Sequence, residues 1–215
     1  MDLKLPQKAW VDKFIAKTKF YEKVSLSSKL QDDFIRKIQK ITWKYKLSET
    51  TIGIRKTDNV TEIQIFEIEL KEQSIPENAL KVIDKAIPYQ ILYQFVFNNN
   101  IAYGITLKGI GKTESTIPQH YYFSEWNEVL NFDFTGIDLE KVYQKLIKAF
   151  IKNEAKEQQN FKTVIDTDNK IKHLEKEIAA LKKKISKEKQ FNRKVELNKK
   201  LLDKQQQLQL IKDVS

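Results

Sequence analysis

The sequence predicts an α+β fold: a mixed or antiparallel sheet of two hairpins with flanking helices, followed by a long helical, coiled-coil-like tail. Three observations lead to this prediction. Residues 61–71 (TEIQIFEIELK) are rich in β-branched and aromatic side chains, as in a core strand. Residues 90–97 are apolar on both faces, as in a central strand. Beyond residue 154, apolar residues recur at heptad spacing. We therefore expect an α+β core domain at residues 1–154 and a basic helical tail at 155–215.

The first part of the chain is expected to form two helices. Trp10 and Phe14 stand four residues apart, which predicts a helix over about residues 7–17. One of the two serines at 27–28 can cap a second helix, and its apolar stripe extends that helix to about Tyr45.

A β-hairpin is expected next. Asp58 and Asn59 form a turn pair between residues 50–57 and 61–71. In a hairpin centred on this pair, the end of the second strand lies beside residues 48 and 49. The remaining expected elements are, in order, a helix at 77–86, strands at 90–97, 101–108 and 120–123, and a helix at 138–152.

One face of the strand at 61–71 changes character along its length. It begins with Ile63 and Ile65 and continues with Glu67, Glu69 and Lys71, because alternate side chains of a strand share a face. Either a β-bulge causes the change, or the strand is covered on both faces at its middle. In the second case the charged residues emerge on a face that began as core.

Glu69 and Lys71 also match the E-x-K half of a motif found in metal-dependent nucleases. With Glu49 placed opposite, the two carboxylates would hold a divalent cation such as Mg²⁺ or Mn²⁺, and Lys71 would stabilise developing negative charge. The order helix, hairpin, helix, strand partly fits a restriction-endonuclease-like core, although the expected upstream aspartate is missing. Two residues at this spacing arise often by chance on solvated strand faces. A nuclease is therefore the alternative, and otherwise we expect no enzymatic activity and no cofactor.

Composition excludes several kinds of site. The 215 residues include no cysteine and two histidines, which removes disulfides, thiolate chemistry and cysteine-based metal sites. No run approaches membrane-spanning length, and the N-terminus lacks an apolar signal region. We expect a cytoplasmic protein without a membrane partner. The net charge is +10, and beyond residue 154 there are 16 basic residues against 9 acidic ones. Such a surface attracts anionic partners.

The tail carries an apolar seam that needs a partner. Two arrangements are open: one continuous helix with a stutter, or a chain that turns near residues 187–190 into an antiparallel helical hairpin. The absence of glycine and proline favours the continuous helix slightly. The seam would then bind a second copy, another protein or its own return arm. Its residues are Ile171, Leu174, Ile178, Leu181, Ile185, Val195 and Leu202.

A dense basic segment overlaps this seam. It is a candidate for contact with the phosphate backbone of DNA or RNA, although charged helices are often only solvated. Its residues are Lys182, Lys183, Lys184, Lys187, Lys189, Arg193 and Lys194.

Five segments resemble an uncharacterised bacterial family of domains of unknown function, family 4391. They are residues 43–47 (WKYKL), 62–71 (EIQIFEIELK), 83–89 (IDKAIPY), 122–126 (YFSEW) and 187–194 (KEKQFNRK). The resemblance covers nearly the whole chain and carries no established chemistry. It implies a setting, because such proteins tend to be encoded beside DNA methyltransferases and helicases of restriction-like defence systems.

The favoured interpretation combines this setting with the basic tail. It is a non-catalytic, nucleic-acid-associated accessory component of a bacterial restriction-like or antiphage defence system. The core would dock a larger enzyme, and the tail would contact a partner or nucleic acid. Besides the nuclease, a second alternative is a structural protein that oligomerises through its coiled coil.

Overall fold

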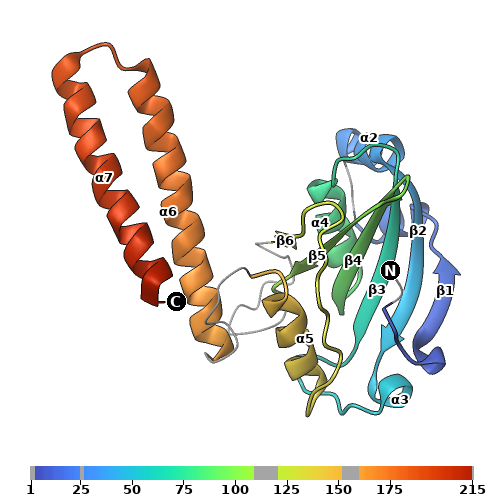
Figure 1. Cartoon of the computed structure of the whole chain (residues 1–215). Coiled ribbons are helices and arrows are strands. Elements are labelled where there is room, and N and C mark those ends of the chain that lie inside the picture. The colour runs from blue at the N-terminus through green and yellow to red at the C-terminus, as the bar shows by residue number, and fades with distance from the viewer. Residues whose placement is uncertain (1–2, 25–26, 109–120, 152–159, 215) are drawn as a thin grey trace. The chain divides into compact units, whose positions relative to one another are not determined.

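A six-stranded mixed sheet forms the centre of the first part of the chain (Figure 1). β3 and β4 are parallel, and the other neighbouring strands are antiparallel. A parallel pair needs a crossover connection, which here is helix α4 (Glu77–Ala86). The predicted α+β fold with a mixed sheet is confirmed. The strands follow one another across the sheet in chain order: β1 (Trp10–Phe14), β2 (Ile38–Leu47), β3 (Ile63–Leu70), β4 (Gln90–Phe97), β5 (Asn100–Thr106) and β6 (Tyr121–Phe123).

The computed structural model describes residues 3–24, 27–108, 121–151 and 160–214. The chain forms two compact units, Met1–Phe150 and Ile151–Ser215. The first unit holds the sheet, and the second holds two long helices. None of the helices in the described ranges combines the length and the apolar character that a membrane crossing requires.

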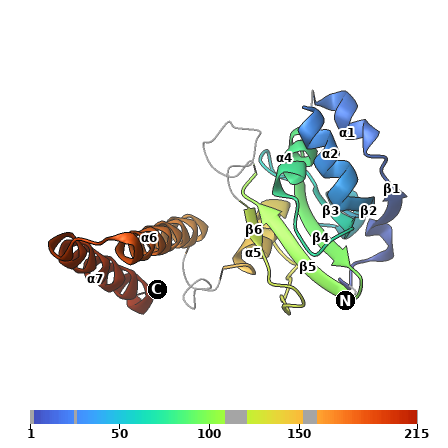
Figure 2. The same cartoon turned by 90° about the horizontal axis from the view of Figure 1, so that it is seen from above.

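Three helices cover one face of the sheet. Helices α1 (Thr18–Lys23), α2 (Ser28–Lys37) and α4 lie together on that side (Figure 2). Helix α5 (Leu139–Lys148) packs against β5, where the Tyr143 hydroxyl donates a hydrogen bond to the backbone oxygen of Thr106. The core under α1, α2 and α4 is made mainly by Phe20, Phe34, Phe66, Ile68, Leu80, Ile83, Tyr93 and Phe95.

The helix predicted over residues 7–17 is wrong. A short 3-10 helix, η1 (Gln7–Ala9), leads directly into edge strand β1. A spacing of four residues fits a strand as well as a helix, because every second side chain of a strand shares a face. Pairing of β1 with β2 therefore decides between the two structures. β1 is irregular at Asp12, whose φ is 47° and where the register shifts between Trp10 and Lys13.

The helix predicted to reach Tyr45 is also too long. α2 ends at Lys37, and β2 begins at Ile38. Ile38 and Ile41 fit a helical stripe, but the segment they belong to is rich in β-branched and aromatic residues that favour a strand. Both isoleucines are fully buried in β2. The strand therefore buries the same apolar side chains that the predicted helix would have buried.

The predicted hairpin has the wrong first strand. Residues 50–57 are not a strand: α3 (Glu49–Ile52) is capped by Gly53, whose φ of 71° suits glycine, and a loop follows. β3 pairs instead with β2, so that Leu47 lies opposite Ile63 and Lys40 lies opposite Glu69. The strong turn pair at 58–59 lies in the connecting loop, because β2 offers a longer complementary strand.

The change of face along β3 comes from coverage on both sides. β3 itself is regular, and the two extra residues that shift the register both lie on β2. Ile63 and Ile65 are fully buried on the face opposite Phe66 and Ile68. The explanation by a bulge in β3 is therefore wrong, and the explanation by coverage at the middle of the strand is confirmed.

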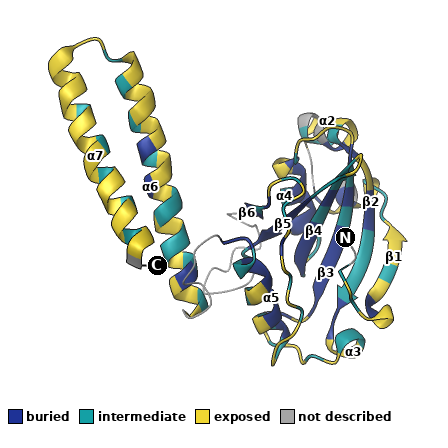
Figure 3. Ribbon diagram, in the orientation of Figure 1, coloured by how far each residue is buried: buried dark blue, intermediate teal, exposed yellow. Residues whose placement is uncertain are grey.

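The second unit is an antiparallel helical hairpin. α6 (Phe161–Lys187) and α7 (Phe191–Val214) pack along each other. The continuous helix is wrong, and the alternative turn near residues 187–190 is confirmed. Glu188 makes this turn without glycine or proline: it has an extended backbone, and its Oε1 accepts a hydrogen bond of 2.9 Å from the Gln190 backbone N–H. Figure 3 shows that most of the hairpin surface is exposed.

Candidate nucleic-acid interface

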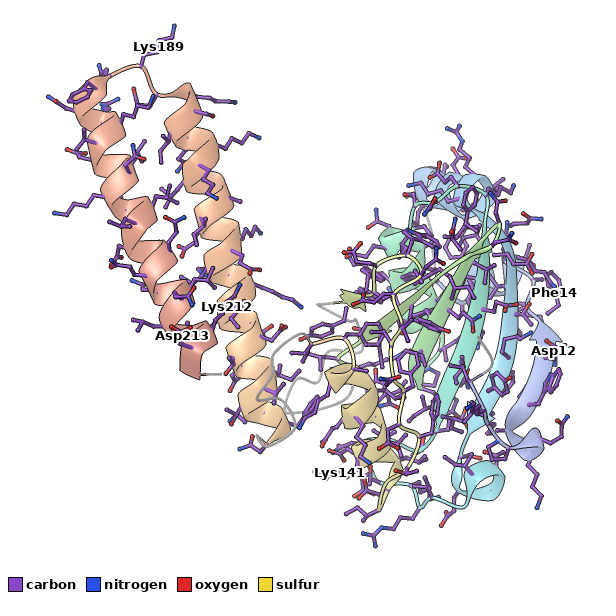
Figure 4. The ribbon with its side chains drawn as sticks, viewed as in Figure 1. Asp12, Phe14, Lys141, Lys189, Lys212 and Asp213 are labelled. Carbon is purple, nitrogen blue, oxygen red and sulfur yellow. The ribbon has the colours of Figure 1, made fainter. Side chains whose placement is uncertain are left out.

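The basic segment lies at the turn of the helical hairpin, and its seven residues are called the basic tip. All seven side chains are exposed, and Lys189 stands in the turn itself (Figure 4). The basic tip consists of Lys182, Lys183, Lys184 and Lys187 on α6, Lys189 in the turn, and Arg193 and Lys194 on α7.

Four of these cations line one groove. The groove has a volume of about 670 Å³ and lies between the two helices where they meet at the turn. Lys183, Lys184 and Lys187 line it from α6, and Arg193 lines it from α7. Its lining is completed by Ala180, Glu188, Glu196 and Leu197. The hairpin therefore brings together cations that are up to ten positions apart in the sequence.

The cations of the basic tip differ from those farther along the hairpin. Lys204 and Lys212 of α7 form ion pairs of 3.0 Å with Glu177 and Glu175 of α6. Within the described ranges, no side chain of the basic tip forms an ion pair. A groove with four such cations and two carboxylates keeps a surplus of positive charge, which favours an anionic ligand.

The apolar seam of α6 is covered by the return arm. Leu174 and Ile178 are buried, and Ile171, Leu181 and Ile185 are half-buried. Of the three possible occupants, the structure therefore places the chain's own α7 on this stripe. On α7 the half-buried positions recur at heptad spacing, at Leu197, Leu201, Lys204, Leu208 and Ile211.

The two predicted seam residues on α7 do not face α6. Val195 and Leu202 are 52% and 57% exposed and lie on the outer side of the helix. They continue the heptads of α6 through the turn, and the turn resets the phase of the next helix, so these two residues point away from the α6–α7 contact.

The three residues predicted to be catalytic do not come together. Glu49 is exposed in the first turn of α3, just beyond the end of β2 that faces Ile63. Glu69 lies six residues farther along β3, at roughly 20 Å for a rise of ~3.3 Å per residue. The expected register was wrong, and with it the proximity of Glu49 to Glu69 and Lys71. Within the described residues, no three His, Asp or Glu side chains form a cluster that could hold a metal ion.

The charged end of β3 instead forms cross-strand ion pairs with β2. Lys40 lies 3.3 Å from Glu69, and Lys44 lies 3.7 Å from Glu67. A third pair, Lys46 and Glu62 at 2.8 Å, lies at the other end, where Glu62 directly precedes β3. Lys71 donates a hydrogen bond of 2.8 Å to the backbone oxygen of Ile35 in α2. Opposite charges on neighbouring strands stabilise a sheet modestly, so the E-x-K spacing has a structural explanation here.

Comparison with known proteins places the chain in a family. The family model described as "Domain of unknown function (DUF4391)" matches residues 3–208. The chain belongs to the DUF4391 family. No curated protein matched in the comparison, and neither did any solved structure.

A buried polar cluster in this DUF4391 chain could not be recognised from sequence patterns. Asp84 of α4 is almost completely buried, and its Oδ2 accepts hydrogen bonds from the hydroxyls of Tyr93 at 3.0 Å and Tyr121 at 2.5 Å. Lys108 Nζ lies 3.7 Å from Asp84 Oδ1 and donates to the backbone oxygens of Asp84, at 2.6 Å, and of Ile87. Asp84 lies within residues 83–89, one of the segments that carry the family resemblance. That resemblance was the one sequence signal that pointed to this cluster.

Burial shifts the ionisation of this cluster. It raises the pKa of Asp84, while the Lys108 ammonium and the two hydroxyl groups oppose that shift. Burial lowers the pKa of Lys108, and the Asp84 carboxylate opposes this. The pKa values of the Tyr93 and Tyr121 hydroxyls are raised by burial and by the neighbouring carboxylate. Because Lys108 also binds the last carbonyls of α4, the cluster joins that helix to the sheet.

Proposed function

We propose that this DUF4391 protein is a non-catalytic accessory component of a bacterial restriction-like or antiphage defence system. In this proposal the basic tip contacts the phosphate backbone of DNA or RNA, and the sheet domain docks on a larger enzyme. The defence setting rests on the family resemblance alone. The nucleic-acid contact rests on the groove at the basic tip.

The groove is the observation that carries the proposal. Its cations come from two helices that a turn holds together, so their spacing is fixed by packing between the helices. Lysine and arginine that neutralise phosphates release condensed counterions, which supplies most sequence-independent affinity. Cations without a carboxylate partner lose no ion pair when they bind phosphate.

Changing the four groove cations to glutamine is expected to weaken binding of a labelled 20-base-pair duplex at least about tenfold at low salt. The slope of log K against log[salt] should fall in magnitude by about 0.9 for each phosphate that the variant no longer neutralises. The variant is Lys183→Gln, Lys184→Gln, Lys187→Gln and Arg193→Gln, measured by fluorescence anisotropy across a salt series. The same series with duplex and single-stranded RNA decides which nucleic acid binds more tightly.

A matched control separates the local site from net charge. The variant Lys170→Gln, Lys176→Gln, Lys199→Gln and Lys200→Gln removes the same charge from exposed positions of the same two helices. It should keep most of the affinity and the salt slope. Equal losses in the two variants, or no binding by the unchanged protein at low salt, would contradict the proposal.

The outer stripe of α7 supports a second role, self-association. Phe191, Val195, Leu202 and Leu210 are 77%, 52%, 57% and 65% exposed. A two-helix hairpin covers only one side of α7, and two hairpins packed together would bury the other side as the core of a four-helix bundle. A second copy offers the same stripe about a two-fold axis, so we take a second copy as the occupant.

Light scattering across a concentration series tests this role. The full chain should approach dimer mass, and Val195→Gln with Leu202→Gln should return it to monomer mass. Val129→Gln with Ile137→Gln is the control, because those side chains are 71% and 70% exposed in the first unit. A full chain that stays monomeric at every concentration would refute self-association.

A further inference from the structure

An aromatic pocket lies in the first unit between α1, β2, β3 and the segment that joins α4 to β4. Its volume is about 250 Å³. Pockets for drug-sized ligands measure about 300–1,000 Å³, so this one suits a single ring system. The side chains that define its chemistry are Lys19, Lys23, Phe20, Trp43, Gln64, Phe66 and Tyr89.

Its walls are aromatic and held in place. Trp43 and Phe66 stack with an interplanar angle of 11° and a centroid distance of 6.5 Å. The Trp43 indole N–H donates a hydrogen bond of 2.9 Å to the backbone oxygen of Tyr45, which fixes the ring. Phe20 and Phe66 are buried, whereas Trp43 and Tyr89 are only partly covered. The two partly covered rings, Trp43 and Tyr89, therefore offer accessible aromatic surface to a ligand in the pocket.

A single polar group lies among these rings. Gln64 is buried, and its amide Nε2 donates a hydrogen bond of 2.5 Å to Glu62 Oε1. Glu62 is held in turn by Lys46 at 2.8 Å. This arrangement orients the Gln64 amide, because a carboxylate accepts and does not donate. Within the described residues, Gln64 Oε1 accepts no hydrogen bond, so the pocket offers one acceptor to a ligand N–H.

Two lysines stand at the rim. Lys19 and Lys23 are one turn apart on α1, and both are exposed. Neither forms an ion pair with another described residue. The pocket thus combines an apolar slot for a flat ring, an acceptor within it and two cations outside it.

We propose that this pocket binds a nucleobase, with Trp43 and Tyr89 stacking on the ring, Gln64 Oε1 accepting an N–H of the base, and Lys19 and Lys23 holding the attached phosphate. Unpaired bases are read in proteins by such stacking and edge hydrogen bonds. An apolar or aromatic side chain of another protein would also fit this pocket, but it would bring no anion to Lys19 and Lys23, whereas a nucleotide brings its phosphate. The proposal shares its ligand class with the basic tip and depends on different residues, so either can fail alone.

Mononucleotides test the pocket without the tail. In a full chain with Trp10→Phe and Trp126→Phe, Trp43 is the remaining tryptophan. Titration with adenosine, guanosine, cytidine and uridine monophosphates should quench its emission saturably. Quenching by at least one nucleotide, reduced by Lys19→Gln with Lys23→Gln, is the expected result. No saturable quenching by any mononucleotide or by a single strand would overturn the proposal and leave the pocket to a different occupant.

Oligonucleotides then distinguish a base within a strand from a free nucleotide. A labelled 15-nucleotide single strand should bind about tenfold more weakly to Tyr89→Ala, since stacking contributes about 1–3 kcal/mol per base. Tyr89→Phe keeps the ring and should bind as the unchanged protein does. An abasic strand of the same length should bind both variants equally, because it has only phosphates to offer.

The variant that lacks the four groove cations (Lys183→Gln, Lys184→Gln, Lys187→Gln and Arg193→Gln) gives the complementary pattern. It should weaken binding of base-containing and abasic strands alike while leaving mononucleotide quenching intact. If base-containing and abasic strands bind the unchanged protein equally but mononucleotides quench Trp43, the pocket takes a free nucleotide. If Tyr89→Ala weakens both strands equally while its melting temperature is unchanged, the stacking assignment is wrong.

Discussion

Replacing Lys108 by methionine is expected to lower the free energy of unfolding of this DUF4391 protein by about 3 kcal/mol or more. The ammonium group is the cation beside Asp84 and the donor to the backbone oxygens of Asp84 and Ile87. Without it, a buried carboxylate loses its partner and the last turn of α4 loses a donor. Both changes leave polar groups unsatisfied in the core.

Urea unfolding at pH 7 measures this effect, and two comparisons sharpen it. Lys145 and Asp133 form an ion pair of 2.7 Å on the surface, so Lys145→Met should cost under about 1 kcal/mol. Adding Asp84→Asn to Lys108→Met removes the orphaned charge and should recover part of the loss. If Lys108→Met costs no more than Lys145→Met, the buried pair does not hold α4 to the sheet.

The loss should also depend on pH in a defined direction. The pKa of Asp84 is raised in the folded protein by burial, and Lys108 opposes that rise. Because methionine at position 108 removes this opposing charge, the pKa of Asp84 should rise further in the variant. A carboxyl whose folded pKa is raised contributes stability below its unfolded pKa, near 4, and loses it as pH rises through the folded pKa. The deficit of Lys108→Met should be smaller at pH 5 than at pH 8.

Local signals in the sequence were enough to locate much of the sheet. β3 and β4 follow from β-branched and aromatic runs, and α4 follows from an apolar stripe after Pro76. β2 did not follow, because Ile38 and Ile41 satisfy a helical period and a strand equally. Its identity depends on pairing with β3, a contact that no local pattern encodes.

Prediction of the candidate sites from the sequence was limited for the same reason, because long-range contacts assemble them. The seven cations of the basic tip could be named from the sequence, but the groove exists only because a turn at Glu188 folds α7 onto α6. Asp84 and Lys108 are 24 residues apart and meet only when β5 lies beside β4. The aromatic pocket is likewise lined by residues of α1 and of two strands, so its lining could not be predicted before the order of the strands was known.

Replacing Gly104 by alanine is expected to lower the free energy of unfolding by about 2 kcal/mol. Gly104 lies in β5 opposite Phe123 of β6. A Cβ atom there would lie 2.8 Å from Phe123 Cδ1 and 2.9 Å from Phe95 Cε2. Phe95 is fully buried and stacks on Tyr93, so it has little room to move. Glycine in a strand often marks this kind of close approach.

A double variant separates this clash from a general weakness of β5. Phe123→Leu alone should cost about 1 kcal/mol, because Phe123 is half-buried and its ring lies on Gly104. Gly104→Ala combined with Phe123→Leu should cost clearly less than the sum of the two single changes, since leucine vacates the position of the ring edge. Additive losses in urea unfolding would show that Phe95, and not Phe123, sets the limit. A Gly104→Ala protein as stable as the unchanged chain would mean that β5 and β6 pack more loosely than their register implies.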